Sequence, residues 1–148
     1  MRNNIRAYAL LTALLAFALF PFGWLTKYSD FADRLIDTLF PNEAAHAVGH
    51  SLLFLAIGAA LLAVFPALRR RPGRYFGLVL LVAVAQEGLQ LLYKRRPVVI
   101  NDITDIGVDL VAAGVMFALW YMWMRAAGRA AAEQRQDGRH AQATGRRG

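Results

Sequence analysis

Residues 44–68, AAHAVGHSLLFLAIGAALLAVFPAL, form an apolar stretch that contains two histidines and no Asp, Glu, Lys or Arg. A helix needs about 20 mostly apolar residues to cross the hydrocarbon core of a bilayer. In lipid, such a stretch satisfies its backbone hydrogen bonds only as a helix. The stretch therefore predicts a membrane-spanning helix over residues 44–66.

Three further apolar stretches lie on either side of this one. Residues 7–25 carry no charge, residues 75–93 carry only Glu87, and residues 103–124 carry only Asp105 and Asp109. The sequence therefore predicts an all-α integral membrane protein, in which residues 1–125 form a bundle of four transmembrane helices. The predicted spans are 7–25, 44–66, 75–94 and 103–124.

The first predicted span has an alternative interpretation as a signal peptide. Arg2 and Arg6 precede the apolar run, and residues 16–18 (AFA) are similar to a cleavage site. The run continues past this site to Leu25, which makes it longer than an h-region of about 7–15 residues. We therefore favour a retained first helix, with cleavage as the alternative.

Two segments outside the spans differ from them in character. Residues 27–41 place apolar side chains on one helical face and charged ones on the other, with Ser29 or Asp30 to cap the start and Pro41 to end it. This pattern predicts a short helix in the outer membrane interface. Residues 126–148 are rich in Ala, Arg, Gln and Gly, which predicts a disordered basic cytoplasmic tail.

The composition agrees with a membrane protein. Of the 148 residues, 57% are hydrophobic and 18% are charged, whereas an ordinary soluble domain has about 25% charged residues. The chain has no cysteine, which excludes disulfide bonds, thiolate chemistry and cysteine-ligated metal clusters.

The net charge of +7 follows from the predicted topology. Twelve of the 17 Lys and Arg residues lie on the side of the two termini and five lie on the other side. The positive-inside rule therefore places both termini in the cytoplasm of a multi-pass protein of the bacterial inner membrane. Arginines at the cytoplasmic membrane surface attract anionic lipids, and no nucleic-acid-binding motif accompanies these arginines in the sequence. We expect membrane lipids, and not nucleic acid, as partners.

Polar residues within the last three spans, together with Arg95 and Arg96 just after the third span, are the candidate functional residues. Their spacing gives each helix one polar stripe, and the predicted topology places all of them in the outer half of the bilayer. Stripes of this kind should face one another, because a charged group in lipid must pair, take up a proton or contact water. The expected binding residues are His46, His50, Glu87, Gln90, Arg95, Arg96, Asp105 and Asp109.

Glu87 is the strongest of these candidates, since its depth in the span excludes a solvated position. For the two histidines, hydrogen bonding to a neighbouring helix is the simpler interpretation, and we favour it over metal binding. His46 and His50 have the spacing of zinc ligands, but Ala47 stands where a His-Glu-x-x-His helix has glutamate. We expect no cofactor, with a divalent metal as the alternative.

The polar motifs also follow one another in a characteristic order. They are Asn42-Glu43-x-x-His46, Glu87-x-x-Gln90, Arg95 or Arg96, and Asp105-x-x-x-Asp109 followed by Gly114. This set, over about residues 40–125, resembles the VanZ-like family of small bacterial membrane proteins. The chain departs from the family at Asn42-Glu43, where an acidic-basic pair is common, near His50, where an aromatic residue is common, and at Asp109, where Asn is common. The resemblance implies a location in the cell envelope and a link to resistance against the glycopeptide teicoplanin.

Three functions are compatible with the polar stripes. In the first, they bind the head group of an amphiphile, a lipid-linked cell-wall intermediate or a glycopeptide, with Arg95 and Arg96 on its phosphate or carboxylate. In the second, an intramembrane enzyme acts on a lipid head group, with Glu87 as general acid or base and Asp105 and Asp109 as further candidate catalytic residues. The third, proton-coupled transport, is disfavoured because no carboxylate lies in the inner half of the spans. We favour head-group binding.

Overall fold

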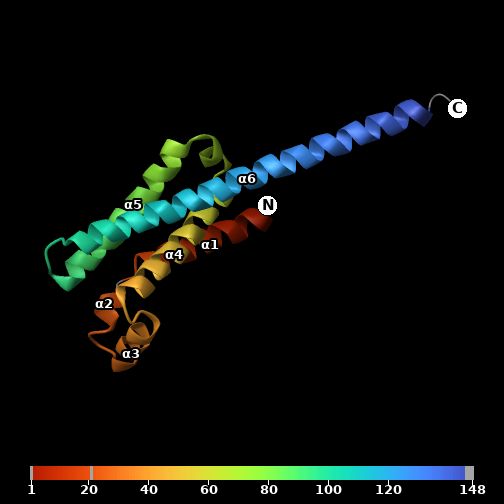
Figure 1. Ribbon diagram of the computed structural model, residues 1–148. Helices are drawn as coiled ribbons and strands as arrows, with labels where there is room; N and C mark the ends of the chain where they lie inside the picture. Colours follow the sequence, from red (N-terminus) through yellow and green to blue (C-terminus); the bar gives the residue numbers. More distant parts are fainter. Residues whose placement is uncertain (1, 21, 146–148) are drawn as a thin grey trace. The chain divides into compact units, whose positions relative to one another are not determined.

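The computed structural model describes residues 2–20 and 22–145, and this part of the chain contains helices and no strand (Figure 1). The long helices are α4 (Glu43–Val64), α5 (Pro72–Lys94) and α6 (Ile100–Gly145). The prediction of an all-helical chain is confirmed. By its internal contacts the chain divides into two compact units, residues 1–117 and residues 118–148.

Three helical segments are long and apolar enough to cross a membrane. They are Glu43–Val64, Pro72–Tyr93 and Ile100–Arg129, and they correspond to the last three predicted spans. Prolines set the boundary between the first two. Helix α4 ends at Val64, because Pro66 disfavours a helical conformation of the residue before it, Phe65. Pro72 occupies the first turn of α5, where its missing N–H costs nothing. The short 3₁₀ helix η1 (Pro66–Arg70) connects them.

The predicted first span differs from one continuous helix. It consists of α1 (Arg2–Ala18) and the four-residue helix α2 (Phe22–Leu25). The sequence between these two helices contains Pro21, and a proline has no N–H to donate and a ring that clashes with the carbonyl four residues earlier in a helix. After the end of α1, the Phe20 N–H bonds to the Phe17 carbonyl in a tighter i to i+3 pattern at 3.2 Å. The apolar helical part, Ile5–Ala18, is shorter than a full span.

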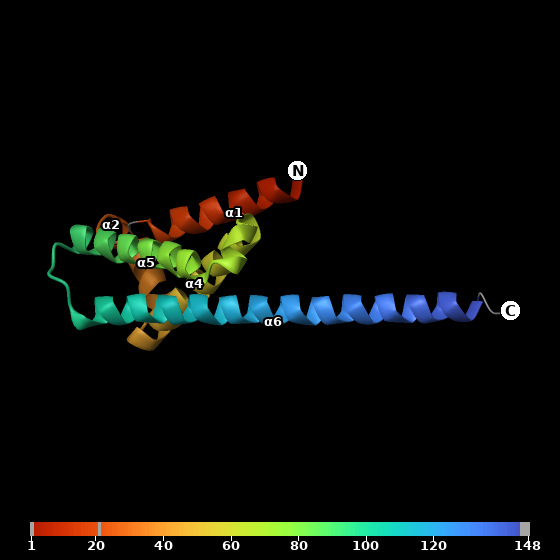
Figure 2. The ribbon, with the colours of Figure 1, turned by 90° about the horizontal axis from the view of Figure 1, so that it is seen from above.

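The two short helices each pack against a long one. α1 lies against α4 and buries Leu11 and Ala18. α2 lies against α5, and Figure 2 shows it beside the C-terminal end of α5. Just after α2, the Lys27 Nζ donates a hydrogen bond to the backbone carbonyl of Tyr93 at 3.3 Å. The segment that follows the first predicted span is therefore tied to the far end of α5.

The predicted short helix between the first two spans is present as α3 (Asp30–Leu39). Ser29 is its N-cap, since its side-chain oxygen accepts the Ala32 N–H at 3.3 Å. The helix buries Ala32 and exposes Phe31, Leu35 and Leu39, so most of its apolar face is not covered by the rest of the described chain.

The C-terminal region differs from the expected disorder. We predicted a disordered tail over residues 126–148, whereas α6 continues without a break to Gly145. Alanine, arginine, glutamine and glutamate are among the stronger helix formers, and they predominate over the glycines in this segment. Residues 146–148 lie outside the described residues. Within the second unit, the guanidinium of Arg125 lies 4.6 Å from the centre of the Tyr121 ring.

A buried tyrosine connects three long helices within the first unit. Tyr75 of α5 is fully buried, and its hydroxyl donates to the backbone carbonyl of Ala113 in α6 at 3.0 Å. On the α4 side the hydroxyl lies so close to Gly58 that a Cβ atom there would overlap it. Gly58 is therefore needed for the approach of α4 to Tyr75, in the way that small residues let membrane helices come close together.

This contact predicts an energetic coupling between two positions. Gly58→Ala should lower the thermal stability of the detergent-solubilised protein, because the new methyl group must displace a hydroxyl that has no room to move. Tyr75→Phe should cost about 1 kcal/mol or less, as is usual for a single interhelical hydrogen bond. In the Tyr75→Phe background the cost of Gly58→Ala should fall. Equal costs in both backgrounds would contradict the described contact.

Candidate functional site

The centre of the candidate site is a hydrogen bond between α4 and α6. His50 Nδ1 and Asp109 Oδ1 lie 3.0 Å apart. The side chain of Asp109 is fully buried and that of His50 is 11% exposed. A buried carboxylate accepts hydrogen bonds when it is ionised, so the geometry favours the tautomer in which His50 Nδ1 donates to Asp109.

The third long helix contributes Glu87 to the same place. One ligand atom from each of His50, Glu87 and Asp105 lies within 4.8 Å of the other two. Glu87 is only 4% exposed. The structure therefore brings together one polar residue each from α4 and α5 and two from α6, and we call His50, Glu87, Asp105 and Asp109 the acidic cluster.

Several oxygens in and beside the acidic cluster have no hydrogen-bond partner among the described residues. Glu87 Oε1 and Asp109 Oδ2 are buried without a hydrogen bond to any described residue, and so is Oε1 of the neighbouring Gln86. Buried polar atoms are nearly always hydrogen-bonded in native proteins, so each such atom calls for an explanation. Sequence reasoning missed Gln86, although a second polar residue next to Glu87 in an apolar span was a visible sign.

Arg96 is occupied by a carboxylate of its own. Both guanidinium nitrogens of its fork bond to Asp102, Nη1 at 2.9 Å. Asp102 also accepts the Val99 backbone N–H at 2.8 Å, which closes the first turn of α6 in the manner of a capping box. The hydrogen bond to Asp102 raises the pKa of the Arg96 guanidinium above its ordinary value. We predicted Arg96 as a ligand-binding cation, but most of its donors are engaged within the chain.

Arg95 differs from Arg96 in both conformation and environment. It ends α5 in the left-handed conformation, with φ 49°, and its side chain is exposed. Its backbone N–H still bonds to the Leu91 carbonyl, which secures the end of the helix. Gln90, one turn before the end of α5, is half-buried.

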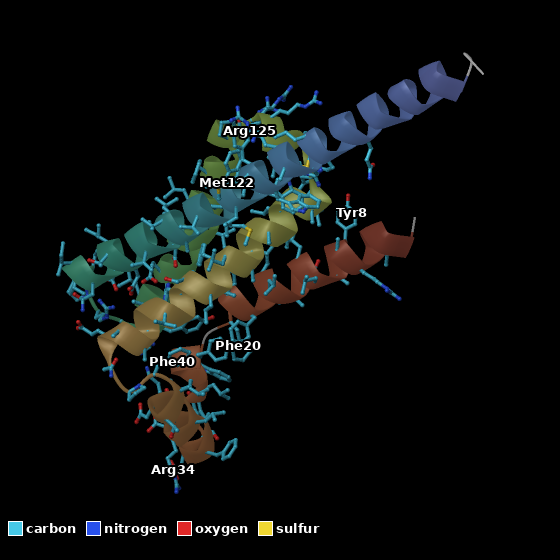
Figure 3. The ribbon with its side chains drawn as sticks, turned by 45° about the vertical axis from the view of Figure 1, so that its right-hand side comes forward. Tyr8, Phe20, Arg34, Phe40, Met122 and Arg125 are labelled. Atoms are coloured by element: carbon cyan, nitrogen blue, oxygen red, sulfur yellow. The ribbon has the colours of Figure 1, made fainter. Side chains whose placement is uncertain are left out.

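His46 lies outside the acidic cluster. Although it is one turn from His50, it is exposed and its ring stacks on Phe40 with 5.1 Å between ring centres. Phe40 also covers Gly49, where a Cβ would stand 2.5 Å from the Phe40 ring. Figure 3 labels Phe40 near the start of α4. The hypothesis of His46 and His50 as a pair of metal ligands is therefore not supported. Nearby, Glu43 accepts a hydrogen bond from the Asn101 side chain at 3.0 Å.

The charges of the acidic cluster are unbalanced. The ion pairs that the described residues form here are His50–Asp109 and Arg96–Asp102. Neither Glu87 nor Asp105 forms an ion pair with any residue in the described ranges. Chemically, the cluster offers an imidazole and several carboxylate oxygens to a cation, an ammonium group or hydroxyl donors.

A comparison of the chain with family models, with curated proteins and with solved structures finds no match in any of the three. The resemblance to the VanZ-like family thus depends on the motif residues.

The His50–Asp109 contact predicts a selective cross-link. The chain has no natural cysteine, so the pair His50→Cys and Asp109→Cys would carry the only thiols. A short bifunctional thiol reagent should join these two positions in membranes, because the side chains that they replace meet at 3.0 Å.

The matched control is the pair His46→Cys and Asp109→Cys. It should react far less, because the side chain of His46 points to Phe40. Equal reaction of both pairs, measured as a shift on gel electrophoresis after a cleavable loop is cut, would contradict the site geometry.

Proposed function

We propose that the chain is a VanZ-like membrane protein of the bacterial cell envelope that binds the head group of an amphiphile. The proposal is carried by the meeting of His50, Glu87 and Asp105 from three apolar helices. Ionisable groups at such positions are costly in lipid, and membrane proteins keep them mainly where they act on a ligand or an ion. The motif order that resembles the VanZ-like family supports the same location.

We further propose that α1 and α2 together form a fourth membrane crossing. The apolar helical part of α1, Ile5–Ala18, is about 21 Å long at 1.5 Å per residue, which alone is shorter than the roughly 30 Å of the hydrocarbon core. The apolar segment continues through α2 to Leu25. A break in a membrane helix is tolerated where protein covers it, and α1 and α2 pack against α4 and α5. Four crossings would put both termini on the same side of the membrane, and the positive-inside rule favours the cytoplasm for that side.

The distribution of charge defines the kind of head group. The carboxylates of the acidic cluster suit hydroxyl and amine donors, whereas the exposed guanidinium of Arg95 suits a phosphate or carboxylate. A lipid-linked cell-wall intermediate carries sugars and phosphate on one apolar tail, and a glycopeptide carries sugars, amines and a carboxylate. Binding of either would connect the chain with glycopeptide resistance.

A second candidate function is catalysis on the same head group. Glu87 is buried, and its Oε1 has no partner among the described residues, so it is available to move a proton. In this alternative Asp105 and Asp109 orient the reacting group, and turnover of the bound amphiphile distinguishes the enzyme from the binding protein.

The four-crossing arrangement predicts the result of reporter fusions. Fusions after Arg71 and after Arg139 should report a cytoplasmic location, because the arginine-rich segments stay inside. Fusions near Asp37 and Val98 should report an external one. An external reporter at Arg71 would reverse the orientation and would overturn the placement of the acidic cluster in the outer leaflet.

Head-group binding predicts a charge-dependent loss of co-purified lipid. Arg95→Gln should reduce the phosphate-bearing amphiphiles retained by the purified protein about tenfold, since it removes a charge-assisted hydrogen bond. Glu87→Gln keeps the volume of the side chain and should reduce retention of the same molecules. The measurement is mass spectrometry of lipids extracted from protein purified in mild detergent.

The control for both variants is Arg34→Gln, which removes an exposed arginine on α3. It should leave the retained lipids unchanged. Retention equal to that of the unaltered chain in both Arg95→Gln and Glu87→Gln, at normal membrane abundance, would refute the proposed function.

A further inference from the structure

We infer that His50, Glu87 and Asp105 bind one divalent cation, and that Asp109 orients His50 toward it. The three residues come from α4, α5 and α6, and each offers a ligand atom within 4.8 Å of the others. Ligands around a shared metal with bonds of about 2.1 Å lie roughly 3.4 Å apart in tetrahedral geometry. Small side-chain rotations would therefore close the group around an ion.

The unpartnered carboxylate oxygen is an independent observation for the site. Glu87 is only 4% exposed, and its Oε1 has no hydrogen-bond partner in the described part of the chain. A structural glutamate at this depth would be expected to satisfy both oxygens through neighbouring donors. A bound cation is a partner that satisfies a carboxylate oxygen without any donor from the protein.

The charge of the acidic cluster also favours a cation. With Arg96 engaged by Asp102, the charged groups that remain are Glu87, Asp105 and Asp109 against a single imidazole. Three carboxylates repel one another strongly in a low-dielectric bundle. A divalent ion offsets this repulsion where no further arginine or lysine pairs with Glu87 or Asp105 in the described residues.

The contact between His50 and Asp109 is of the kind that orients a metal-binding histidine. Histidine ligands commonly donate their other ring N–H to a carboxylate, which fixes the tautomer and the direction of the ring. Here Nδ1 faces Asp109 Oδ1 at 3.0 Å, which leaves Nε2 with a lone pair. Asp109 is fully buried and is thus held in place to perform this positioning role.

The donor set selects the class of metal. One imidazole with carboxylates suits borderline ions such as Zn²⁺ and Mn²⁺, whereas Mg²⁺ and Ca²⁺ prefer oxygen ligands alone. A bound ion would also change what the acidic cluster attracts, since it would present a positive charge to a phosphate oxygen of the head group. That last step rests on the proposed function, but the metal site itself does not.

The test uses the full chain, purified in mild detergent, freed of any polyhistidine tag and stripped with EDTA. After EDTA is removed, the protein is exposed to Zn²⁺ alone or Mn²⁺ alone, passed through gel filtration and analysed for metal. The unaltered chain should retain about one Zn²⁺ per chain. His50→Gln, Glu87→Gln and Asp105→Asn should each lose most of it, and Asp109→Asn should weaken affinity about 10–100-fold.

The matched control is His46→Gln, which removes the histidine one turn away that stacks on Phe40. It should retain metal as the unaltered chain does. The site is overturned if the unaltered chain retains no metal, if the three ligand variants retain as much as it does, or if His46→Gln loses it as well. Circular dichroism and gel-filtration volume identify any variant that fails to fold.

The imidazole ligand can also be tested without any variant, on the unaltered chain. Electron spin-echo spectra of Mn²⁺ bound to the unaltered chain should show coupling to an imidazole nitrogen, and bound Mn²⁺ without this coupling would overturn the assignment. The lipid experiment is separate from this one. Metal binding with no retained amphiphile would refute only the proposed function, and retained amphiphile with no metal would refute only the cation site.

Discussion

The structure depends on one constraint, which is that a polar group within an apolar helix must meet another polar group. The 3.0 Å contact between His50 and Asp109 satisfies this constraint between α4 and α6, and it fixes how these two helices face each other. The Tyr75 hydroxyl does the same between α5 and α6 through the Ala113 carbonyl. Because apolar side chains gain little by leaving lipid for protein, such contacts and close packing carry much of the specificity of a membrane bundle.

Much of the fold could be predicted from the sequence because lipid imposes a simple rule on length and polarity. The apolar runs predicted the positions of α4, α5 and the first part of α6. Ser29, followed by apolar residues on one helical face and charged residues on the other, predicted α3. The interruption between α1 and α2 was underestimated, because the high hydropathy of residues 7–25 draws attention away from the proline in their sequence, which lacks a backbone donor. The helical end of α6 was missed because low hydrophobicity was weighed above helix propensity.

The candidate site was predictable in part, and the exceptions have identifiable causes. Helical spacing gave the common face of Asp105 and Asp109, and it also placed His46 with His50. The expectation that His46 lies with His50 fails because of a tertiary contact: Phe40, in the connection before α4, stacks on the His46 ring. Arg96 was expected to face a ligand, but Asp102 is placed by the first turn of α6 to take its guanidinium. Contacts made by loop residues do not follow helical periodicity, and so sequence spacing alone does not predict them.

The pairing of Arg96 with Asp102 has a consequence for any ligand at this end of the molecule. Arg96 lies near enough to Glu87 and Asp105 for their charges to interact, but its ion pair is with Asp102. Among the described residues, the ion pair of the acidic cluster itself is the one between His50 and Asp109. A phosphate in direct contact with Glu87 and Asp105 would be repelled, whereas hydroxyls of the same head group could donate to these carboxylates and its phosphate could bind the exposed Arg95. Sugar hydroxyls or an ammonium group suit the cluster as it stands, whereas a phosphate suits it only beside a divalent ion. The sign of the charge that the cluster presents is therefore the property that separates the two classes of head group.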